Sequence, residues 1–270
     1  MIKDLFKALL GNGLAEETFR ARLEADEMPA ALYAIGDVHG RFDLLKALEA
    51  RIYADGDAFE GEKWIVMLGD LIDRGPASAQ VLDHMLHPPP QGWRRICLCG
   101  NHDHTMAAAM RDKAMMEQWL SFGGVETLAS YGVELGALAD AGGRWSRLQA
   151  ILDSSIPSEH IRFLDALPIM LAVPGYVFVH AGLRPGVPLE RQTDDDMMWI
   201  RTGNVTPYDV FPFVIVHGHT PTDTVDLSAQ IINIDTGAFA SGILTAIRIT
   251  PDKKLTVIQT TGAESGKQYE

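Results

Sequence analysis

The sequence has few cysteines and no long apolar run. Only Cys97 and Cys99 occur among the 270 residues. They lie two positions apart in an expected strand, so both side chains would point to one face and a disulfide between them would be badly strained. We therefore expect two reduced thiols in a cytoplasmic protein. No stretch approaches the roughly 20 apolar residues of a membrane span, and the amphipathic segment 1–10 has too short an apolar part for a secretory signal.

Basic clusters are also missing. The chain carries 23 Lys and Arg against 36 Asp and Glu, a net charge of −13, and no run of Lys or Arg is longer than the pair Arg94-Arg95. Proteins that follow a nucleic-acid backbone need clustered cations, so we expect neither a nucleic-acid nor a membrane partner. The share of hydrophobic residues, 47%, is typical of a globular protein with a sizeable core. Metal cations held by Asp side chains would offset part of the acidic excess.

Three apolar segments of the front half end in glycine followed by a polar residue. The segments 31–35, 64–67 and 95–99 precede Gly36-Asp37, Gly69-Asp70 and Gly100-Asn101. The polar residues of successive pairs are 33 and 31 positions apart, which fits one strand–helix–strand unit for each interval. Such strands are parallel neighbours, so we expect the three polar ends to meet at one edge of a sheet, where open α/β sheets place their ligand sites.

The remaining segments predict two helical regions and a strand-rich end. We expect an N-terminal helical extension over 1–30, and a helical insert over 104–165 whose methionines fill core gaps. The strands expected after it are 169–173, 176–179, 213–216, 231–234, 243–249 and 255–259. Short spacings and turn residues favour antiparallel pairing among them. No linker divides the chain, so we expect one domain over 1–270.

Polar residues at the ends of five predicted strands suggest a metal site. These residues are Asp37, His39, Asp70, Asn101, His102, His180, His217 and His219. Carboxylate, amide and imidazole groups together suit divalent ions such as Mn²⁺, Fe²⁺ or Zn²⁺, and they do not indicate a thiolate site. If six of these residues bind metal, they are too many for one tetrahedral zinc. Six ligands fit two ions about 3.5–4 Å apart that share a bridging carboxylate. One such residue alone is usually structural; their joint occurrence at regular spacing favours the site.

The strand-end residues belong to an ordered set of motifs. The set is Gly36-Asp-x-His-Gly40, Gly69-Asp-x-x-Asp-Arg-Gly75, Gly100-Asn-His-Asp103, His180-Ala-Gly182 and Gly218-His-Thr220. It resembles the calcineurin-like metallophosphoesterases, and more narrowly the bacterial branch of the PPP-type serine/threonine protein phosphatases. Met198–Arg201 and Ile234–Gly237 extend the resemblance. It implies an α/β fold with a central mixed β-sandwich flanked by helices.

The resemblance also implies a role for each matching residue. Asp37, His39 and His219 would bind one divalent ion and Asn101 and His180 the other, with Asp70 bridging; Mn²⁺ is expected ahead of Fe or Zn. His102 would be the general acid, oriented by Asp73. Arg74 and Arg201, with Asn101 beside them, would bind the phosphoryl oxygens. Asp103, His104 and His217 are left outside the set.

The implied mechanism is direct hydrolysis at phosphorus. Two cations lower the pKa of a bridging water, and the resulting hydroxide attacks phosphorus in line. The arginines and cations stabilise the charge on the equatorial oxygens. No Cys or Ser nucleophile is suggested, so no covalent phosphoenzyme is expected.

Several substrate classes fit this chemistry. The first is a phosphorylated protein or small phosphomonoester, favoured by the Asp73-Arg74 pair; the second is a symmetrical dinucleoside polyphosphate, because the stretch Trp119 to Gly132 resembles the diadenosine tetraphosphate hydrolases. A phosphodiesterase is disfavoured by Pro221, which stands where those relatives commonly carry a second His. A scaffold with a degenerate site is disfavoured because all ligands and the acid are present.

Phe239 is expected to be a packed loop aromatic, and the sequence carries no signal for an oligomeric state.

Overall fold

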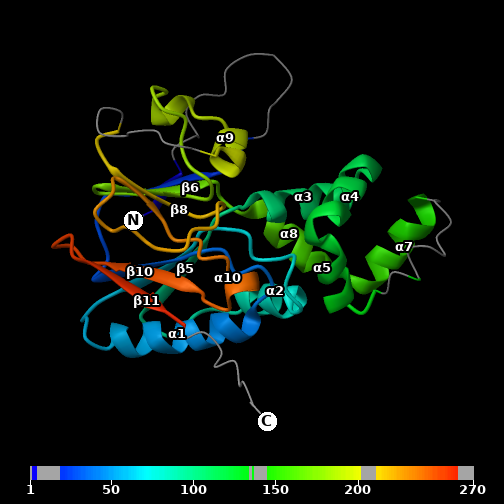
Figure 1. Cartoon of the computed structure of the whole chain (residues 1–270), viewed down its shortest axis with the longest axis horizontal. Helices are drawn as coiled ribbons and strands as arrows, with labels where there is room; N and C mark the ends of the chain where they lie inside the picture. Colours follow the sequence, from blue (N-terminus) through cyan, green and yellow to red (C-terminus); the bar gives the residue numbers. More distant parts are fainter. Residues whose placement is uncertain (1, 5–18, 134–135, 137–144, 202–210, 261–270) are drawn as a thin grey trace, which may run out of the picture.

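Two stacked β-sheets with helices on their outer faces form the body of the protein (Figure 1). The structure is a computed structural model that describes residues 2–4, 19–133, 136, 145–201 and 211–260. A five-stranded sheet has the order β11–β10–β3–β4–β5, and a six-stranded sheet has the order β1–β2–β6–β7–β8–β9. This mixed α/β sandwich confirms the predicted fold class.

The five-stranded sheet contains the three predicted front strands. β3 (Ala31–Ile35), β4 (Lys63–Met67) and β5 (Trp93–Cys97) are parallel, and β10 (Thr245–Ile249) joins β3 antiparallel and pairs with β11 (Leu255–Gln259). Ile35 pairs with Met67, and Met67 pairs with Cys97. The carboxyl ends of the three parallel strands are therefore level, as the spacing of the glycine pairs predicts.

Two helices connect the front strands and cover the outer face of this sheet. α1 (Phe42–Gly56) follows β3 and α2 (Ser78–Leu86) follows β4. α1 buries Leu44, Leu45, Leu48 and Ile52, which recur at helical spacing on one face. Figure 1 shows α1 below the five-stranded sheet, so both faces of the parallel strands are covered.

The six-stranded sheet corrects part of the predicted pairing. Its last four strands are β6 (Met170–Val173), β7 (Tyr176–Val179), β8 (Val214–His217) and β9 (Ile231–Asn233). β6 and β7 form the expected antiparallel hairpin, but β7–β8 and β8–β9 are parallel. The connections 180–213 and 218–230 are long enough for crossovers, which parallel pairing requires. η2 (Leu189–Arg191) and α9 (Asp194–Trp199) lie in the first of them.

The helical prediction for 1–30 is wrong wherever the structure describes this segment. Ile2–Asp4 forms strand β1 and Arg22–Ala25 forms strand β2, while 5–18 lie outside the described residues. β2 pairs parallel with β6, and the Arg22 side chain donates to the carbonyl oxygens of Leu189 and Gln192. These tertiary contacts outweigh the helix propensity of the Ala-, Glu- and Arg-rich sequence.

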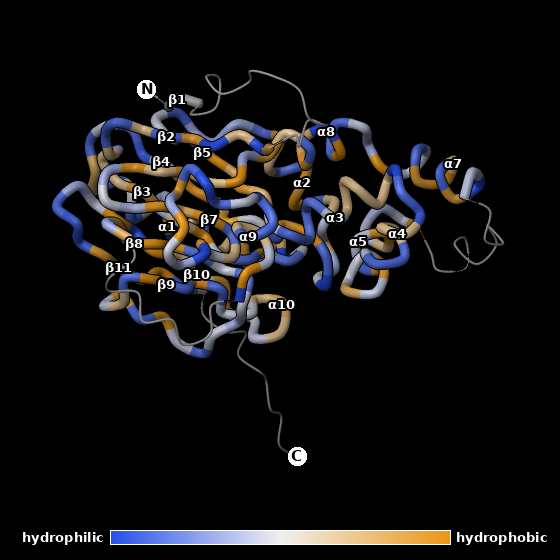
Figure 2. Tube along the Cα trace, turned by 90° about the horizontal axis from the view of Figure 1, so that it is seen from above, coloured by the Kyte–Doolittle hydropathy of each residue, from blue (hydrophilic) through white to orange (hydrophobic). Residues whose placement is uncertain are grey.

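A helical lobe stands beside the sheets, at the edge where the front strands end (Figures 1 and 2). Its helices are α3 (Asn101–Ala109), α4 (Lys113–Trp119), the π-helical turn η1 (Leu120–Gly124), α5 (Val125–Ser130), α7 (Trp145–Ser155) and α8 (Ser158–Ala166). Met106 and Met116 are buried in it, so the methionines do fill the core. A short helix, α10 (Ala238–Ser241), follows β9.

Two hydrophobic clusters hold the layers together. One lies between the sheets and includes Leu32, Val66, Phe178 and Ile232; the other joins the outer faces to the helices. In Figure 2 the apolar residues, coloured orange, are frequent along the strands. Within the described part of the chain, no helix has the length and apolar character of a membrane span.

Candidate metal centre and active site

The predicted strand-end residues of both sheets meet at one edge of the sandwich. Asp70 follows β4 and His180 follows β7, on different sheets, yet His180 Nε2 lies 3.4 Å from Asp70 Oδ1. His180 Nδ1 is 3.0 Å from the carbonyl oxygen of Leu68, which fixes the imidazole across the gap. The backbone N–H groups of Val38 and His39 donate to the carbonyl oxygen of Asp70. Segments distant in sequence are therefore neighbours here.

The backbone of this edge is strained at the predicted site residues. Among the described residues, six non-glycine residues have positive φ, and only Lys253 lies outside the predicted set. The others are His39 (43°), Asp70 (48°), Asp73 (73°), Arg74 (66°) and His219 (69°). Left-handed φ in ordinary residues costs about 1–3 kcal/mol each and clusters at functional sites. The motifs thus encode turns that re-aim side chains at the ends of strands.

Two glycines let carboxylates approach the backbone. A Cβ on Gly218 would lie 2.0 Å from Asp37 Oδ1, and one on Gly100 would lie 2.2 Å from Asp70 Oδ1. Neither contact is sterically allowed, so these positions require glycine because of space. The Gly-Asp, Gly-Asn and Gly-His pairs of the sequence are therefore part of the site.

Asp70 lies between two groups of potential ligands. One group is Asp70, His39 and His102, the other is Asp70, His180 and His219, and within each group the ligand atoms lie within 4.8 Å of one another. His39 Nε2 is 3.5 Å from Asp70 Oδ2, on the side opposite the Oδ1 that faces His180. One carboxylate with different histidines at its two oxygens has the arrangement of a bridging ligand.

His219 joins a different group from the one we expected. Its Nδ1 lies 2.9 Å from Asn101 Oδ1 and 3.2 Å from His180 Nε2, and His180 Nε2 is itself 2.9 Å from Asn101 Oδ1. The expected grouping with Asp37 and His39 is not what the structure has. The reason is local: β7 and β8 are parallel neighbours, and the left-handed turn at His219 aims its ring at His180.

The burial of these imidazoles keeps them neutral, as metal ligation requires. Burial lowers the pKa of His39 and of His219 to about 3, and it also lowers the pKa of His180. Burial alone would raise the pKa of Asp70, but the imidazoles of His180, His102 and His39 lower it below its usual value. His219 Nε2 is buried without a hydrogen-bond partner. Neutral imidazoles, an anionic carboxylate and an amide oxygen at these distances fit divalent cations.

Asp37 lies near a second buried acid, Asp235, which we did not select from the sequence. Asp37 accepts from the backbone N–H of His219 at 3.1 Å and is buried. Burial, Asp235 and Asp70 raise its pKa well above the usual range, and burial raises the pKa of Asp235 to about 6. A cation would relieve the repulsion among these carboxylates. Asp235 follows β9 as Asp37 follows β3, so the strand-end pattern could have found it.

His102 differs from the other imidazoles of the site. Its Nδ1 is 2.7 Å from Asp73 Oδ2, and its Nε2 accepts from Arg74 Nη2 at 3.0 Å. Burial alone would lower its pKa, but Asp70 and the hydrogen bond to Asp73 raise it above the usual value. When the environment raises the pKa of one imidazole and lowers the pKa of its neighbours, the imidazoles usually have different catalytic roles. The predicted His102–Asp73–Arg74 unit is therefore assembled.

Phe122 and Phe239 contact this unit and Trp199 lies beside His219, and we had not placed any of the three at the site. Phe122 lies 4.6 Å from His102 between ring centroids, and Trp199 lies 6.4 Å from His219. Phe239, which we expected to be packed, is 37% exposed and holds the Arg74 guanidinium over its ring at 4.8 Å. These contacts arise from tertiary packing, so periodicity in the sequence could not reveal them.

Within the described part of the chain, Arg201 makes no hydrogen bond or ion pair with the other predicted site residues. It is exposed just beyond α9, and its charge contributes to the lowered pKa of His219. Asp103 is structural, as expected, because its carboxylate accepts the backbone N–H groups of Leu71 and Gly100. His217 is buried, with Nδ1 2.9 Å from the carbonyl oxygen of Gly218.

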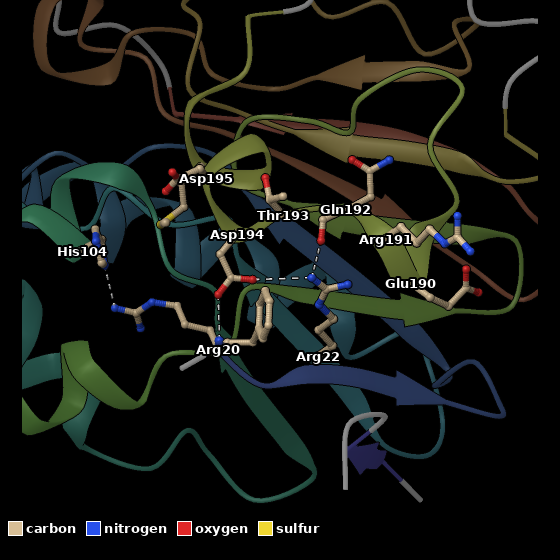
Figure 3. A pocket seen from close by; sticks show the side chains of 11 residues that line it. Arg20, Arg22, His104, Glu190, Arg191, Gln192, Thr193, Asp194 and Asp195 are labelled. Atoms are coloured by element: carbon tan, nitrogen blue, oxygen red, sulfur yellow. Dashed lines mark hydrogen bonds and ion pairs between the residues drawn. The ribbon is translucent and has the colours of Figure 1, made fainter. Parts of the chain in front are cut away.

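His104 lines a separate cavity of about 530 Å³ (Figure 3). Arg20 Nη2 lies 3.3 Å from His104 Nδ1, and the backbone N–H of Arg20 donates to Asp194 of α9 at 2.7 Å. Arg22 also pairs with Asp194, at 3.6 Å. Figure 3 shows these charged groups turned toward one another, so they attach β2 to α9 and support the helix that carries Trp199.

Two curated proteins are similar in sequence to this chain. The symmetrical bis(5'-nucleosyl)-tetraphosphatase of Aromatoleum aromaticum is 31% identical over 158 residues, which is 58% of this chain and 45% of that protein. The asymmetrical bis(5'-nucleosyl)-tetraphosphatase PrpE of Halalkalibacterium halodurans is 28% identical over 236 residues, 79% of this chain and 88% of that protein. The match thus spans about half the length of the symmetrical relative.

Solved structures and the family pattern agree on the fold. A provisionally assigned diadenosine tetraphosphatase superposes with a TM-score of 0.61 at 19% identity, covering 90% of this chain and 99% of that one. A cold-active protein tyrosine phosphatase superposes with a TM-score of 0.54 at 18% identity, covering 86% and 81%. The pattern of the calcineurin-like phosphoesterases matches residues 31–239, well over half of the chain. The chain therefore belongs to the calcineurin-like phosphoesterase family.

Proposed function

We propose that the chain binds two divalent cations and hydrolyses phosphate linkages by direct attack of water on phosphorus. The position of Asp70 between two ligand groups is the observation that carries this proposal. Cations at these groups would act as Lewis acids that activate the attacking water and neutralise charge on the phosphoryl oxygens. The proposed ligands are Asp37, His39 and Asp70 on one side and Asp70, Asn101, His180 and His219 on the other, with Mn²⁺ as the first ion to test.

The chain's own residues would then bind the phosphoryl group and protonate the leaving oxygen. The planar Arg74 guanidinium can donate to two phosphoryl oxygens, and Arg201 would add a second positively charged side chain. Arg74 now donates to His102 Nε2. A phosphoryl group that took this donor would free Nε2 to hold a proton. Asp73 would keep the imidazole in the orientation that delivers this proton to the leaving oxygen.

A dinucleoside polyphosphate is the substrate class that we propose first. The curated relatives named above carry this activity in their names. Trp199 and Phe239 support it, because they are 39% and 37% exposed at the rim of the site. Aromatic side chains bind bases by stacking, at about 1–3 kcal/mol per base. A phosphoserine side chain would offer these rings nothing to stack on.

A phosphorylated protein is the second candidate, and one observation favours it. The Asp73-Arg74 pair matches the protein phosphatases better than the symmetrical hydrolases. The buried free thiols Cys97 and Cys99 favour a cytoplasmic setting for either substrate.

A substrate panel with the Mn²⁺-reconstituted protein tests the proposal. The panel comprises diadenosine tetraphosphate, a serine phosphopeptide, p-nitrophenyl phosphate and bis-p-nitrophenyl phosphate. We expect the highest kcat/KM on diadenosine tetraphosphate. Products of two ADP would identify symmetrical cleavage, and ATP with AMP would identify asymmetrical cleavage. A higher kcat/KM on the phosphopeptide would reverse the order of the two candidates, and no hydrolysis of any substrate would refute both.

A further inference from the structure

Two side chains of the helical lobe hold the carboxylate of Asp73. Trp119 Nε1 donates to Asp73 Oδ1 and Oδ2, at 3.0 Å each. The Thr127 hydroxyl donates to Oδ1 at 2.7 Å and accepts the backbone N–H of Asp73 at 2.9 Å. His102 occupies Oδ2 at 2.7 Å. Each oxygen of the carboxylate is thus bound from the lobe, and the plane of the group is fixed.

These bonds are needed because Asp73 is deeply buried. Its exposed fraction is 0%, as are those of Trp119 and Thr127, so water is not available to solvate the charge. Burial raises the pKa of Asp73, while the bonds from His102, Thr127 and Trp119 oppose that rise. An ionised carboxylate in such a place requires several donors. Trp119 and Thr127 supply two of the three side-chain donors.

The backbone of the lobe is shaped for this contact. Gly123 has a φ of 126° in the π-helical turn, and its carbonyl oxygen accepts the backbone N–H of Arg74 at 3.2 Å. A Cβ at Gly123 would lie 3.0 Å from the backbone nitrogen of Arg74. The Ser130 hydroxyl accepts the backbone N–H of Ala79. The stretch Trp119 to Gly132, which we singled out in the sequence without a role, therefore packs on the loop that carries Asp73 and Arg74.

We propose that Trp119 and Thr127 are positioning residues, which orient the Asp73 carboxylate so that it holds His102 in the geometry for proton transfer. This inference rests on the proposed function in one respect, the role of His102 as the acid. A carboxylate free to rotate would lose its alignment with His102 Nδ1, and the imidazole would lose its orientation. The helical insert would then be part of the catalytic apparatus as well as a wall of the site.

The contact itself can be tested without any substrate or metal. The chain has five tryptophans, so ¹⁵N-Trp labelling gives few indole N–H signals, and Trp119→Phe assigns the relevant one. We expect this signal to be protected from exchange and to shift in Asp73→Asn, with smaller shifts of the other indoles. An exposed indole N–H at Trp119, or one insensitive to Asp73→Asn, would overturn the proposal.

The catalytic consequence is tested by leaving-group dependence. Phenyl phosphate needs a proton on its leaving oxygen, whereas 2,4-dinitrophenyl phosphate has a leaving group stable as the anion. We expect Thr127→Val and Trp119→Phe to lower kcat on phenyl phosphate about 10- to 100-fold, within the range of general-acid catalysis and of supporting-residue effects. KM and the rate on the dinitrophenyl ester should change about twofold or less, and Thr127→Ser should restore most of the activity.

Tyr131→Phe is the matched control. It removes the hydrogen bond from Tyr131 to His160 Nδ1 in the same lobe but no contact with Asp73. It should leave both rates near the wild-type values. Equal losses on both esters in Thr127→Val and Trp119→Phe would mean a general structural role and would refute the proposal, as would an unchanged rate on phenyl phosphate. An inactive wild-type protein would refute the proposed function, while the indole signal would still decide whether the contact exists.

Discussion

Histidines with opposite environments define the chemistry at the scale of single residues. His39, His180 and His219 are buried and have lowered pKa values, whereas Asp70 and the hydrogen bond to Asp73 raise the pKa of His102. Neutral imidazoles bind cations, and an imidazole with a raised pKa donates protons near neutral pH. On the proposed function, the same residue type would serve two purposes within a few ångströms, because His102 has Asp73 as an additional partner.

Replacement of His102 separates these purposes. His102→Asn should lower kcat by about 10²- to 10⁴-fold, the usual contribution of a general acid. Metal content, measured by inductively coupled plasma mass spectrometry, should stay near the wild-type value. His102 lies in one group with His39 and Asp70, so a parallel loss of metal would make it a ligand and contradict its assignment as the acid.

Arg74 should be required for phosphate recognition. Arg74→Ala should raise the inhibition constant of inorganic phosphate about tenfold or more, because it removes hydrogen bonds between charged groups. The matched control is Arg94→Ala, since Arg94 is an exposed arginine that pairs with Glu62 near the opposite end of β5. An unchanged inhibition constant in Arg74→Ala would remove Arg74 from the site.

His217 predicts a pH dependence of stability. Burial lowers its pKa from 6.5 to about 4. Between these values the unfolded chain binds a proton that the folded chain does not, so stability falls as the pH falls from 6.5 toward 4. At pH 5 the cost is roughly 2 kcal/mol. Urea unfolding of the metal-free wild type should give a lower free energy of unfolding at pH 5 than at pH 7. In His217→Asn this loss should be smaller by roughly 2 kcal/mol. Equal losses in the two proteins would contradict the lowered pKa.

At the scale of elements, the site depends on strands that end in a glycine and then turn sharply. Sequence patterns could predict these strands, because apolar runs bounded by glycine recur at even spacing. The parallel pairing of β8 with β7 and β9 and the strands within 1–30 could not be predicted, since pairing over long connections depends on tertiary contacts. The proposed ligands could be predicted from the strand ends, but we overlooked Asp235. Trp119, Thr127 and Phe239 reach the site only through packing of the lobe and α10.

A change at one strand end should therefore disrupt the whole centre. Gly218→Ala places a methyl group 2.0 Å from Asp37 Oδ1. We expect this variant to lose metal uptake and to melt at a lower temperature, as measured by metal analysis and differential scanning fluorimetry. Gly136→Ala is the control, because a Cβ at Gly136 meets nothing within 4 Å. Normal metal content in Gly218→Ala would show that Asp37 does not need its present position.

At the scale of the whole molecule, the sandwich brings residues from 37 to 219 to one edge, and the helical lobe closes over the acid. Neither sheet could form the centre alone, because the five-stranded sheet provides Asp37, Asp70 and Asn101 and the six-stranded sheet provides His180 and His219. The central claim is that this shared edge holds two cations on either side of Asp70.

Anomalous diffraction from crystals of the Mn²⁺-reconstituted protein, recorded at the manganese edge, tests that claim most directly. We expect two anomalous peaks per chain that flank the Asp70 carboxylate, one beside His39 and the other beside His180 and His219. A single peak, or peaks remote from Asp70, would contradict it.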